Sequence, residues 1–296
     1  MCNFRDKFKA VLLSLKENNS DSVEILNRTI IPNIPEKLFR FRGLSEYSIN
    51  NFKDDVIYTC HAADFNDPYD CLTYYDFREI EAFHMKHLKN ITAEDIKQKL
   101  QFQLAYIRTQ FREDVTSFAC FTENVRNTLM WAHYADYHKG FALEYDFKGF
   151  PINIEIRNEN GESTNGLGLY PEIYSDERYD GSNLFKFLIA PWCEDKDEIV
   201  KNYRDDFFWQ KFYLHKSLEW SYEQEWRLIN NDTTFEKRGT REINYKPTAI
   251  YYGVNIEANK QIFNQLREYA KSKNMKEYQM YLKEDLRKHE FDYIPI

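Results

Sequence analysis

Glycine and proline are scarce in this chain of 296 residues, which contains 9 glycines and 8 prolines. Disordered chains are rich in such residues and poor in aromatic ones, whereas 17% of this sequence is Phe, Trp or Tyr. A chain of this length can bury a sizeable core. No segment rich in proline, glycine or serine divides it, so we expect one enlarged domain over residues 1–296.

Cysteine is scarce as well, and long apolar runs are missing. The five cysteines are scattered and form no CxxC pair, which predicts free thiols in a reducing cytosol. No apolar run approaches the roughly 18 residues of a membrane-spanning helix, and the N-terminus has no signal-peptide core. We therefore expect a cytoplasmic protein that has no membrane partner.

Motifs of common metal and phosphate sites are also missing. The sequence has no HExxH, Walker or GxSxG motif, and residues 166–168 form a lone GxG in a polar loop expected over residues 158–168. The segment from Asp64 to Asp70 has Tyr69 where a calcium loop requires glycine. We expect no bound metal ion. The net charge of −8 argues against broad nucleic-acid binding, although it leaves room for a local basic groove.

Hydrophobic periodicity predicts strands and helices that are mixed without regular βαβ alternation. The fold class is therefore α+β, with a central mixed β-sheet and helical insertions. Strands are expected at residues 37–42, 56–60, from 117 onward, 141–145, 226–229, 249–252 and 276–282. Helices are expected at residues 4–17, 45–51, 79–113 with a break near 90–92, 184–216 and 258–272, and a polar connection at 18–36.

The stretch from residue 117 to 145 is the most informative part of the sequence. A short strand leads into a compact helix that carries Trp131, His133 and Tyr134, and Gly140 separates this helix from the next strand. Ordinary core helices do not concentrate such residues, so the helix either packs a polar network or faces a ligand. We expect Trp131 to be buried, and His133 or Tyr134 to face a cleft.

The same helix has recognisable ends. Asn127 or Thr128 precedes it and is a residue type that caps helix N-termini, and Gly140 is typical of the position just beyond a helix end. The sequence therefore predicts a helix that starts near Thr128 and ends near Tyr137.

Two pairs of charged residues stand out on predicted strands. Alternation along residues 38–42 places Arg40 and Arg42 on one face, where they can form a fork for phosphate or carboxylate. A solvated edge strand is the alternative. Glu223 and Glu225 share a face if their segment is extended, although carboxylates are poor strand formers. The alternative there is an ion-paired strand end, with Glu225 bound to an arginine.

These segments resemble a large uncharacterised bacterial family, domain-of-unknown-function family 2971. The anchors lie in one order at residues 38–42, 57–70, 117–140, 174–176, 220–227 and 250–253. The resemblance covers about residues 37–255, which leaves residues 1–36 as a helical extension and 256–296 as a C-terminal helix and strand. Membership of this family implies no proven activity.

The order of a basic first strand, an aromatic or hydroxyl residue on a second strand and a late ExE also resembles the ADP-ribosyltransferase fold. This resemblance implies that Arg40 or Arg42 holds NAD, that Tyr58 or Ser117 lines the cleft, and that Glu225 is catalytic. The other ExE carboxylate, Glu223, becomes a second catalytic candidate.

Three functions remain open. The first is an NAD-using ADP-ribosyltransferase-like or NAD-hydrolysing effector in phage defence or a toxin system, with a protein or nucleic-acid acceptor. In it, Trp131, His133 and Tyr134 would contact the small nucleotide ligand. The second is a non-catalytic module that senses a nucleotide or small anion, or binds a partner. The third is a magnesium-dependent phosphodiesterase or nuclease that uses acidic residues 64, 67 and 70. The first function requires Arg40 or Arg42 and Glu225 to converge on one cavity.

Overall fold

The computed structural model describes residues 3–109, 112–113, 116–148, 166–231, 242–284, 287 and 289–296. Its centre is one mixed sheet of eight strands. These strands are β1 Leu38–Arg42, β3 Thr116–Thr122, β4 Phe141–Tyr145, β5 Gly166–Pro171, β8 Glu225–Asn231, β10 Ala249–Tyr252, β11 Lys276–Leu282 and β12 Phe291–Pro295. The spatial order is β12-β11-β10-β4-β1-β3-β8-β5. All neighbours are antiparallel except β10 and β11.

Two smaller strand pairs flank this sheet. The antiparallel pair joins β2, Val56–Tyr58, to β9, Glu242–Asn244. The parallel pair joins β6, Ile173–Ser175, to β7, His215–Ser217. Together with the helices, these sheets confirm the predicted α+β class and its central mixed sheet. Strands β1, β4 and β8, which correspond to the strands expected at residues 37–42, 141–145 and 226–229, all belong to the central sheet.

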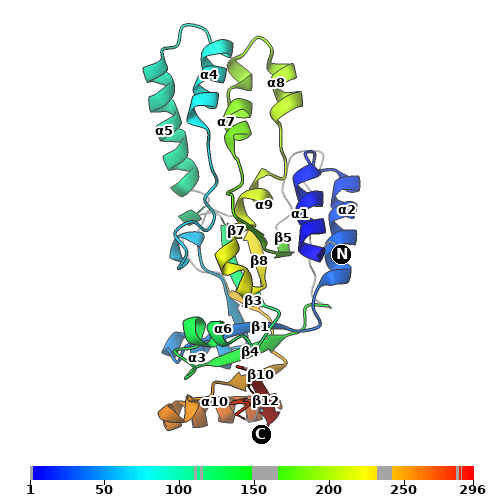
Figure 1. The fold of residues 1–296 in the computed structure, drawn as a ribbon, viewed down its shortest axis with the longest axis vertical. Coiled ribbons are helices and arrows are strands. Elements are labelled where there is room, and N and C mark those ends of the chain that lie inside the picture. Colours follow the sequence, from blue (N-terminus) through cyan, green and yellow to red (C-terminus); the bar gives the residue numbers. More distant parts are fainter. Residues whose placement is uncertain are drawn as a thin grey trace.

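The helices lie around the sheet and beyond one end of it (Figure 1). They are α1 Phe4–Ser14, α2 Ser20–Ile30, α3 Glu46–Lys53, α4 Phe77–His87, α5 Ala93–Thr109, α6 Thr128–Tyr134, α7 Ser182–Leu188, α8 Lys196–Tyr203, α9 Phe208–Tyr213 and α10 Lys260–Ser272. Helices α4, α5, α7 and α8 project as a lobe at one end, and α10 connects the parallel strands β10 and β11 near the other. None of the helices in the described ranges is long and apolar enough to cross a membrane.

The sheet buries an apolar cluster on each face. The larger cluster includes Phe118 and Trp226 and reaches Phe8 of α1. The smaller cluster packs Phe41 of β1 against Trp131 of α6. Because adjacent strand residues point to opposite faces, β1 contributes to both clusters. The projecting lobe has its own small apolar clusters, which keeps its helices together away from the sheet.

Several predicted elements need correction. Residues 18–36 were predicted to be a polar connection, but they contain α2 and a short 3-10 turn. Asn19, whose polarity suggested a loop, is the helix N-cap and accepts a hydrogen bond from the Ser22 amide. Val23, Leu26 and Ile30 then form the buried face of α2 at helical spacing.

The later corrections concern broken or shortened elements. The predicted helical stretch 184–216 is split into α7, α8 and α9 and ends in β7. The strand predicted at 56–60 ends at Tyr58, and Cys60 forms an isolated bridge with Phe118. Of the polar loop predicted at 158–168, residues 158–165 lie outside the described ranges and residues 166–168 begin β5.

Candidate functional site

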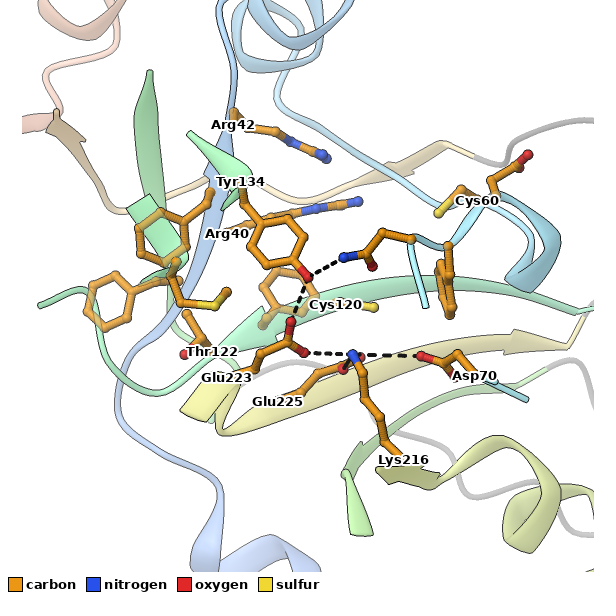
Figure 2. A pocket seen from close by; sticks show the side chains of 17 residues that line it. Arg40, Arg42, Cys60, Asp70, Cys120, Thr122, Tyr134, Lys216, Glu223 and Glu225 are labelled. Atoms are coloured by element: carbon orange, nitrogen blue, oxygen red, sulfur yellow. Dashed lines mark hydrogen bonds and ion pairs between the residues drawn. The ribbon is translucent and has the colours of Figure 1, made fainter. Parts of the chain in front are cut away.

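A cavity of about 270 Å³ lies where β1 and β3 separate (Figure 2). The two strands pair only at Phe39↔Thr122, whereas β1 pairs with β4 along its whole length. Side chains from both strands line the space, together with helix α6 and the segment that follows β2. The described lining residues are Phe39, Arg40, Phe41, Arg42, Cys60, Asp64, Phe65, Asn66, Asp70, Cys120, Phe121, Thr122, Met130, Tyr134, Lys216, Glu223 and Glu225.

One side of this cavity carries the two arginines of β1. Arg40 is 7% exposed, and its Nη2 donates a hydrogen bond of 2.6 Å to the carbonyl of Tyr58. Its Nη1 is buried and has no hydrogen-bond partner in the described residues. Arg42 is partly buried and makes no ion pair with any described carboxylate. Burial and the neighbouring Arg40 charge lower the pKa of the Arg42 guanidinium, so an anion placed here would relieve both costs.

The opposite side carries carboxylates that are gathered around Lys216. Its Nζ lies 2.6 Å from Glu223 Oε2, 3.0 Å from Glu225 Oε2 and 3.7 Å from Asp70 Oδ2 (Figure 2). All four side chains are buried. Lys216 lies in β7, which follows α9, whereas Glu223 precedes β8 and Glu225 is its first residue. The group therefore forms only when the chain folds.

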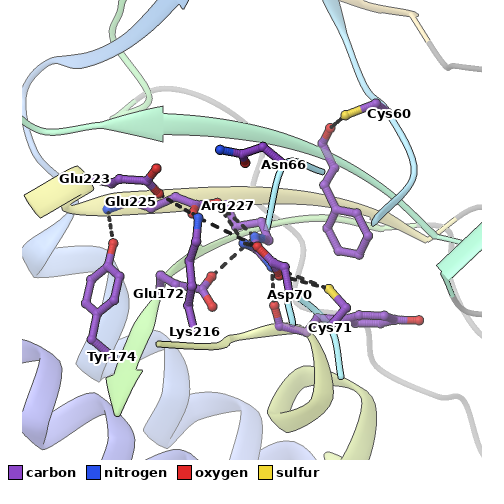
Figure 3. Close-up of polar contacts among 12 residues, drawn as sticks. Cys60, Asn66, Asp70, Cys71, Glu172, Tyr174, Lys216, Glu223, Glu225 and Arg227 are labelled. Atoms are coloured by element: carbon purple, nitrogen blue, oxygen red, sulfur yellow. Dashed lines mark hydrogen bonds and ion pairs between the residues drawn. The ribbon is translucent and has the colours of Figure 1, made fainter. Parts of the chain in front are cut away.

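A second cation, Arg227, lies behind this group and is fully buried (Figure 3). It forms a fork with Asp70, in which Nη1 and Nη2 each donate at 3.0 Å. Its Nη2 also lies 2.9 Å from Glu225 Oε1, and its Nε lies 3.3 Å from Glu172 Oε2. Four buried carboxylates therefore surround two buried cations. This arrangement favours protonation of at least one carboxyl group.

The neighbouring charges separate the pKa values of these acids. Burial alone would raise the pKa of Glu225, but the attraction of Arg227 and Lys216 outweighs it and lowers that pKa well below its usual range. Burial raises the pKa of Glu223 despite Lys216, with added repulsion from Glu225. Burial also raises the pKa of Glu172 well above its usual value. Opposite shifts in adjacent carboxyls are typical of acid–base pairs at active sites.

Tyr134 connects the carboxylates to the segment that follows β2. Its hydroxyl donates a 2.6 Å hydrogen bond to Glu223 Oε1 and accepts one of 3.0 Å from Asn66 Nδ2. Burial and the Glu223 charge raise the pKa of this hydroxyl far above its usual range, so it stays a donor. Helix α6 thus places the Tyr134 hydroxyl against Glu223, the carboxyl group whose pKa is raised.

The local structure of α6 explains how this hydroxyl is positioned. Asn127 caps the helix by accepting hydrogen bonds from the amides of Leu129 and Met130, as predicted. The helix ends at Tyr134 rather than near Tyr137, because residues 136–138 adopt left-handed backbone conformations with φ of 46–67°. Gly140 follows, and a Cβ at this position would lie 2.1 Å from the Arg42 carbonyl oxygen. The segment between α6 and β4 is therefore in direct contact with the arginine strand.

Two predicted cleft residues on neighbouring strands do not line the cavity. The ring of Tyr58 packs edge-on against Tyr47 at 4.5 Å, and only the Tyr58 carbonyl reaches Arg40. Ser117 is fully buried and accepts a hydrogen bond of 2.8 Å from Thr59 Oγ1. Both residues therefore lie outside the cavity lining.

Two predicted ligand contacts on α6 also lie elsewhere. The Trp131 indole is fully buried, as expected, and packs against Phe41 at 4.9 Å, so it cannot stack on a ligand. His133 is exposed and lies beside the ring of Tyr222, outside the cavity lining. Of the pair expected to face a cleft, Tyr134 does so.

The predicted charged pairs do meet. Arg40, Arg42, Glu223 and Glu225 line the same cavity. The alternative reading of Glu225 as part of an ion pair also holds, because its partner is Arg227. Alternation along one strand places Glu225 and Arg227 on the same face, so this pair was readable from sequence.

Two of the acidic residues considered for a magnesium site, Asp67 and Asp70, bind other groups of the protein. Asp70 faces Arg227 and Lys216, and Asp67 accepts a hydrogen bond from the amide of Tyr69. Within the ranges that the structure describes, no group of three potential ligands is placed to hold a metal ion.

Comparison with known proteins found one similarity, to a family model that covers residues 130–228. Residues 130–228 match a family model described as "Protein of unknown function (DUF2971)". This match supports the family resemblance over the segment that carries Tyr134, Lys216 and the two glutamates. Arg40, Arg42 and Asp70 lie outside it. No curated protein and no solved structure matches the chain.

Proposed function

We propose that this protein binds a nucleotide with a negatively charged diphosphate and a positively charged ring, namely NAD, and cleaves its nicotinamide–ribose bond. The observation that carries the proposal is the division of charge within one cavity. Arg40 and Arg42 lack carboxylate partners in the described residues on one side, and Glu223 and Glu225 lie on the other. NAD carries charges of both signs in one extended molecule.

The arginine side is suited to the diphosphate. Planar guanidinium groups bind phosphate oxygens through paired donors, and the free Nη1 of Arg40 supplies one donor that is already desolvated. The cavity also contains flat apolar surfaces from Phe41, Phe65 and Phe121. Such surfaces can hold a ribose or a ring between the charged walls.

The carboxylate side is suited to the reacting ribose. When the C1′–N bond breaks, its electron pair goes to the nicotinamide nitrogen and leaves a neutral ring. Positive charge then develops on the ribose, as in glycoside hydrolysis, and the ionised Glu225 would stabilise it. The oxygen of water or of an acceptor attacks C1′ and loses a proton. Glu223, whose pKa is raised, is suited to receive that proton.

The proposed chemistry fits a biological setting in which the protein acts on cellular NAD. Transfer to water would deplete NAD, and transfer to a protein or nucleic acid would modify that acceptor. Either outcome suits an effector in phage defence or a toxin system. We expect expression of the wild-type chain in bacteria to lower cellular NAD and slow growth, and the Glu225→Gln variant to do neither.

A second function, a non-catalytic nucleotide or anion sensor, is favoured by one observation. Both oxygens of Glu225 are already engaged, Oε1 by Arg227 and Oε2 by Lys216. A carboxylate that is neutralised in this way stabilises a developing positive charge less strongly. Under this alternative the acids hold the architecture of the cavity, and Arg40 and Arg42 bind the ligand.

Calorimetric titration with NAD and ADP-ribose, combined with detection of free nicotinamide, separates the two functions. We expect both nucleotides to bind the wild type, and Arg42→Met to weaken binding about tenfold or more through loss of one charged hydrogen-bond partner. Arg28→Met removes an exposed arginine that pairs with Glu24 and should leave binding unchanged. Binding with nicotinamide release supports the enzyme. Binding without release supports the sensor, and absence of binding contradicts both the enzyme and a sensor of these two nucleotides.

A further inference from the structure

Helix α1 contacts the strand that carries Glu225 through Phe4 and Arg5, neither of which lines the cavity. Arg5 of this helix donates from Nη1 to the carbonyl oxygens of Glu172, at 2.8 Å, and Glu225, at 3.0 Å. Its Nη2 donates to Glu123 Oε1 at 2.7 Å. Arg5 is not among the residues that line the cavity, and it lies outside the segment that matches the family model.

The neighbours of Arg5 hold the same short piece of backbone. The Arg5 guanidinium lies 5.6 Å from the ring centre of Tyr174, and the Tyr174 hydroxyl accepts a hydrogen bond of 2.8 Å from the Glu225 amide. Glu123 Oε1 also accepts a bond from Trp226 Nε1 at 2.7 Å, and Trp226 stacks on Phe4 of α1. The peptide groups on both sides of the Glu225 Cα are thus held from α1 and its neighbours.

The turn between the two glutamates explains why such support matters. Gln224 has a φ of 46°, a left-handed conformation that is unfavourable for a residue with a side chain. This turn makes Glu223 and Glu225 converge on Lys216 instead of pointing along a regular strand. Contacts from outside the turn are needed to keep such a conformation.

We propose that Arg5 is a positioning residue that holds Glu225 in the orientation required at the cavity. This inference rests on the proposed function for its catalytic consequence, although its structural part does not. It makes helix α1, which precedes the family-matched segment, an element that completes the site.

A second cavity makes this inference testable by chemical rescue. A space of about 220 Å³ lies beside Arg5 and is lined in part by Lys9, Tyr174 and Gln224. Removing the Arg5 side chain enlarges this existing space at the position of the guanidinium. A small guanidinium ion supplied in solution could then reach the carbonyl oxygens that Arg5 leaves.

The experiment compares Arg5→Ala and Arg5→Lys with Lys9→Ala. Lys9 lies on the same helix, lines the same space and, among the described residues, donates only to Ser175 Oγ, at 3.3 Å. We expect Arg5→Ala to lower the kcat of nicotinamide release by about 10- to 100-fold with little change in KM, because misplacement of a catalytic group has this effect. Guanidinium at non-denaturing concentration should restore part of the rate, and methylammonium should not.

The remaining variants make the outcomes decisive. Arg5→Lys keeps the charge but lacks the fork, so we expect an intermediate loss, and Lys9→Ala should behave like the wild type with or without guanidinium. A wild-type rate in Arg5→Ala, or equal rescue by methylammonium, would overturn the positioning role. If Arg5→Ala does not fold, Arg5→Lys decides: an unchanged rate overturns the role, and a lower kcat at constant KM supports it.

Hydrogen exchange separates this inference from the proposed function. If the wild type releases no nicotinamide, the proposed function fails, but the exchange rate of the Glu225 amide remains measurable. We expect that amide to exchange at least tenfold faster in Arg5→Ala than in the wild type or Lys9→Ala, and to slow when guanidinium is added. Equal exchange in all three proteins would show that Arg5 does not hold this strand.

Discussion

Lys216 places one ammonium group among three buried carboxylates, those of Asp70, Glu223 and Glu225. Burying charge is costly, and such a group is stable only when opposite charges compensate each other at short distance. The network therefore contributes geometry more than net stability. It keeps two carboxylates together at the cavity although their mutual repulsion would separate them.

Substitution of Lys216 by methionine tests this dependence. The change preserves the length of the side chain but leaves Glu223 without a cation and leaves Asp70 and Glu225 with Arg227 alone, so we expect the free energy of unfolding to fall by about 3–5 kcal/mol. Urea denaturation at neutral pH measures it. Lys89→Met, which removes an exposed lysine paired with Glu194, is the control and should change little. A small loss in Lys216→Met would show that the network relaxes without its cation.

Glu172 gives a prediction of pH dependence. Burial raises its pKa well above the reference of 4.5, so the folded chain keeps a proton that the unfolded chain loses as pH rises past that value. This group therefore lowers the stability of the folded chain increasingly above pH 4.5, until the pH reaches its folded pKa. Each unit of the shift corresponds to about 1.4 kcal/mol.

Glu172→Gln keeps the shape of the protonated acid and has no proton to lose. We expect it to unfold at a higher denaturant concentration than the wild type near neutral pH, and the difference to shrink as pH falls towards 4.5. Denaturation curves across this pH range measure the effect. A variant that is less stable than the wild type at neutral pH would indicate an ionised Glu172 whose pairing with Arg227 stabilises the fold.

At the scale of elements, the segment that connects α6 to β4 packs against β1 at Gly140. A Cβ on Gly140 would lie 2.1 Å from the carbonyl oxygen of Arg42. We expect Gly140→Ala to reduce the free energy of unfolding by about 1–3 kcal/mol through overpacking. It should also weaken pyrophosphate binding, because Arg42 must move.

Gly43→Ala is the matched control for this change. Its added Cβ would meet nothing closer than 3.6 Å, and it is also adjacent to Arg42 in sequence. Thermal unfolding and calorimetric titration with pyrophosphate measure both effects. Equal behaviour of the two variants would show that contact between α6 and β1 does not position Arg42.

Elements with a strong apolar pattern were predictable from the sequence. The strand at residues 249–252 and the helix near residues 258–272 were found almost to the residue. Helix α2 was missed because its polar N-cap sequence outweighed its buried face. The gap between β1 and β3 could not be predicted, since it depends on which residues of distant strands pair.

Some residues of the candidate site were predictable from the sequence, and others were not. Arg40, Arg42 and the two glutamates were predictable, because paired charges in segments that read as extended conflict with ordinary strand propensity. Glu223 itself lies in a 3-10 turn before β8. Lys216 carried no local signal, since a single lysine after a helix is usually exposed. Its role comes from burial against residues that lie in other elements, which only the folded chain brings together.

At the scale of the whole molecule, the cavity lies at β1 and β3, two inner strands of the central sheet. The family-matched segment supplies Tyr134, Lys216, Glu223 and Glu225, and the chain before that segment supplies the arginines. Neither part contains both charged walls. We therefore expect binding and any catalysis to require the intact chain.

Release of nicotinamide from NAD by the wild type and by Glu225→Gln is the most direct test of the proposed function. Glu225→Gln keeps the shape of the side chain and removes its charge, so we expect NAD to bind and the rate to fall by about 10² or more, the usual effect of losing one electrostatic stabiliser. Glu219→Gln, an exposed neighbour, should retain the wild-type rate. Equal rates in Glu225→Gln and the wild type, or no release by the wild type with acceptors supplied, would contradict catalysis at this cavity.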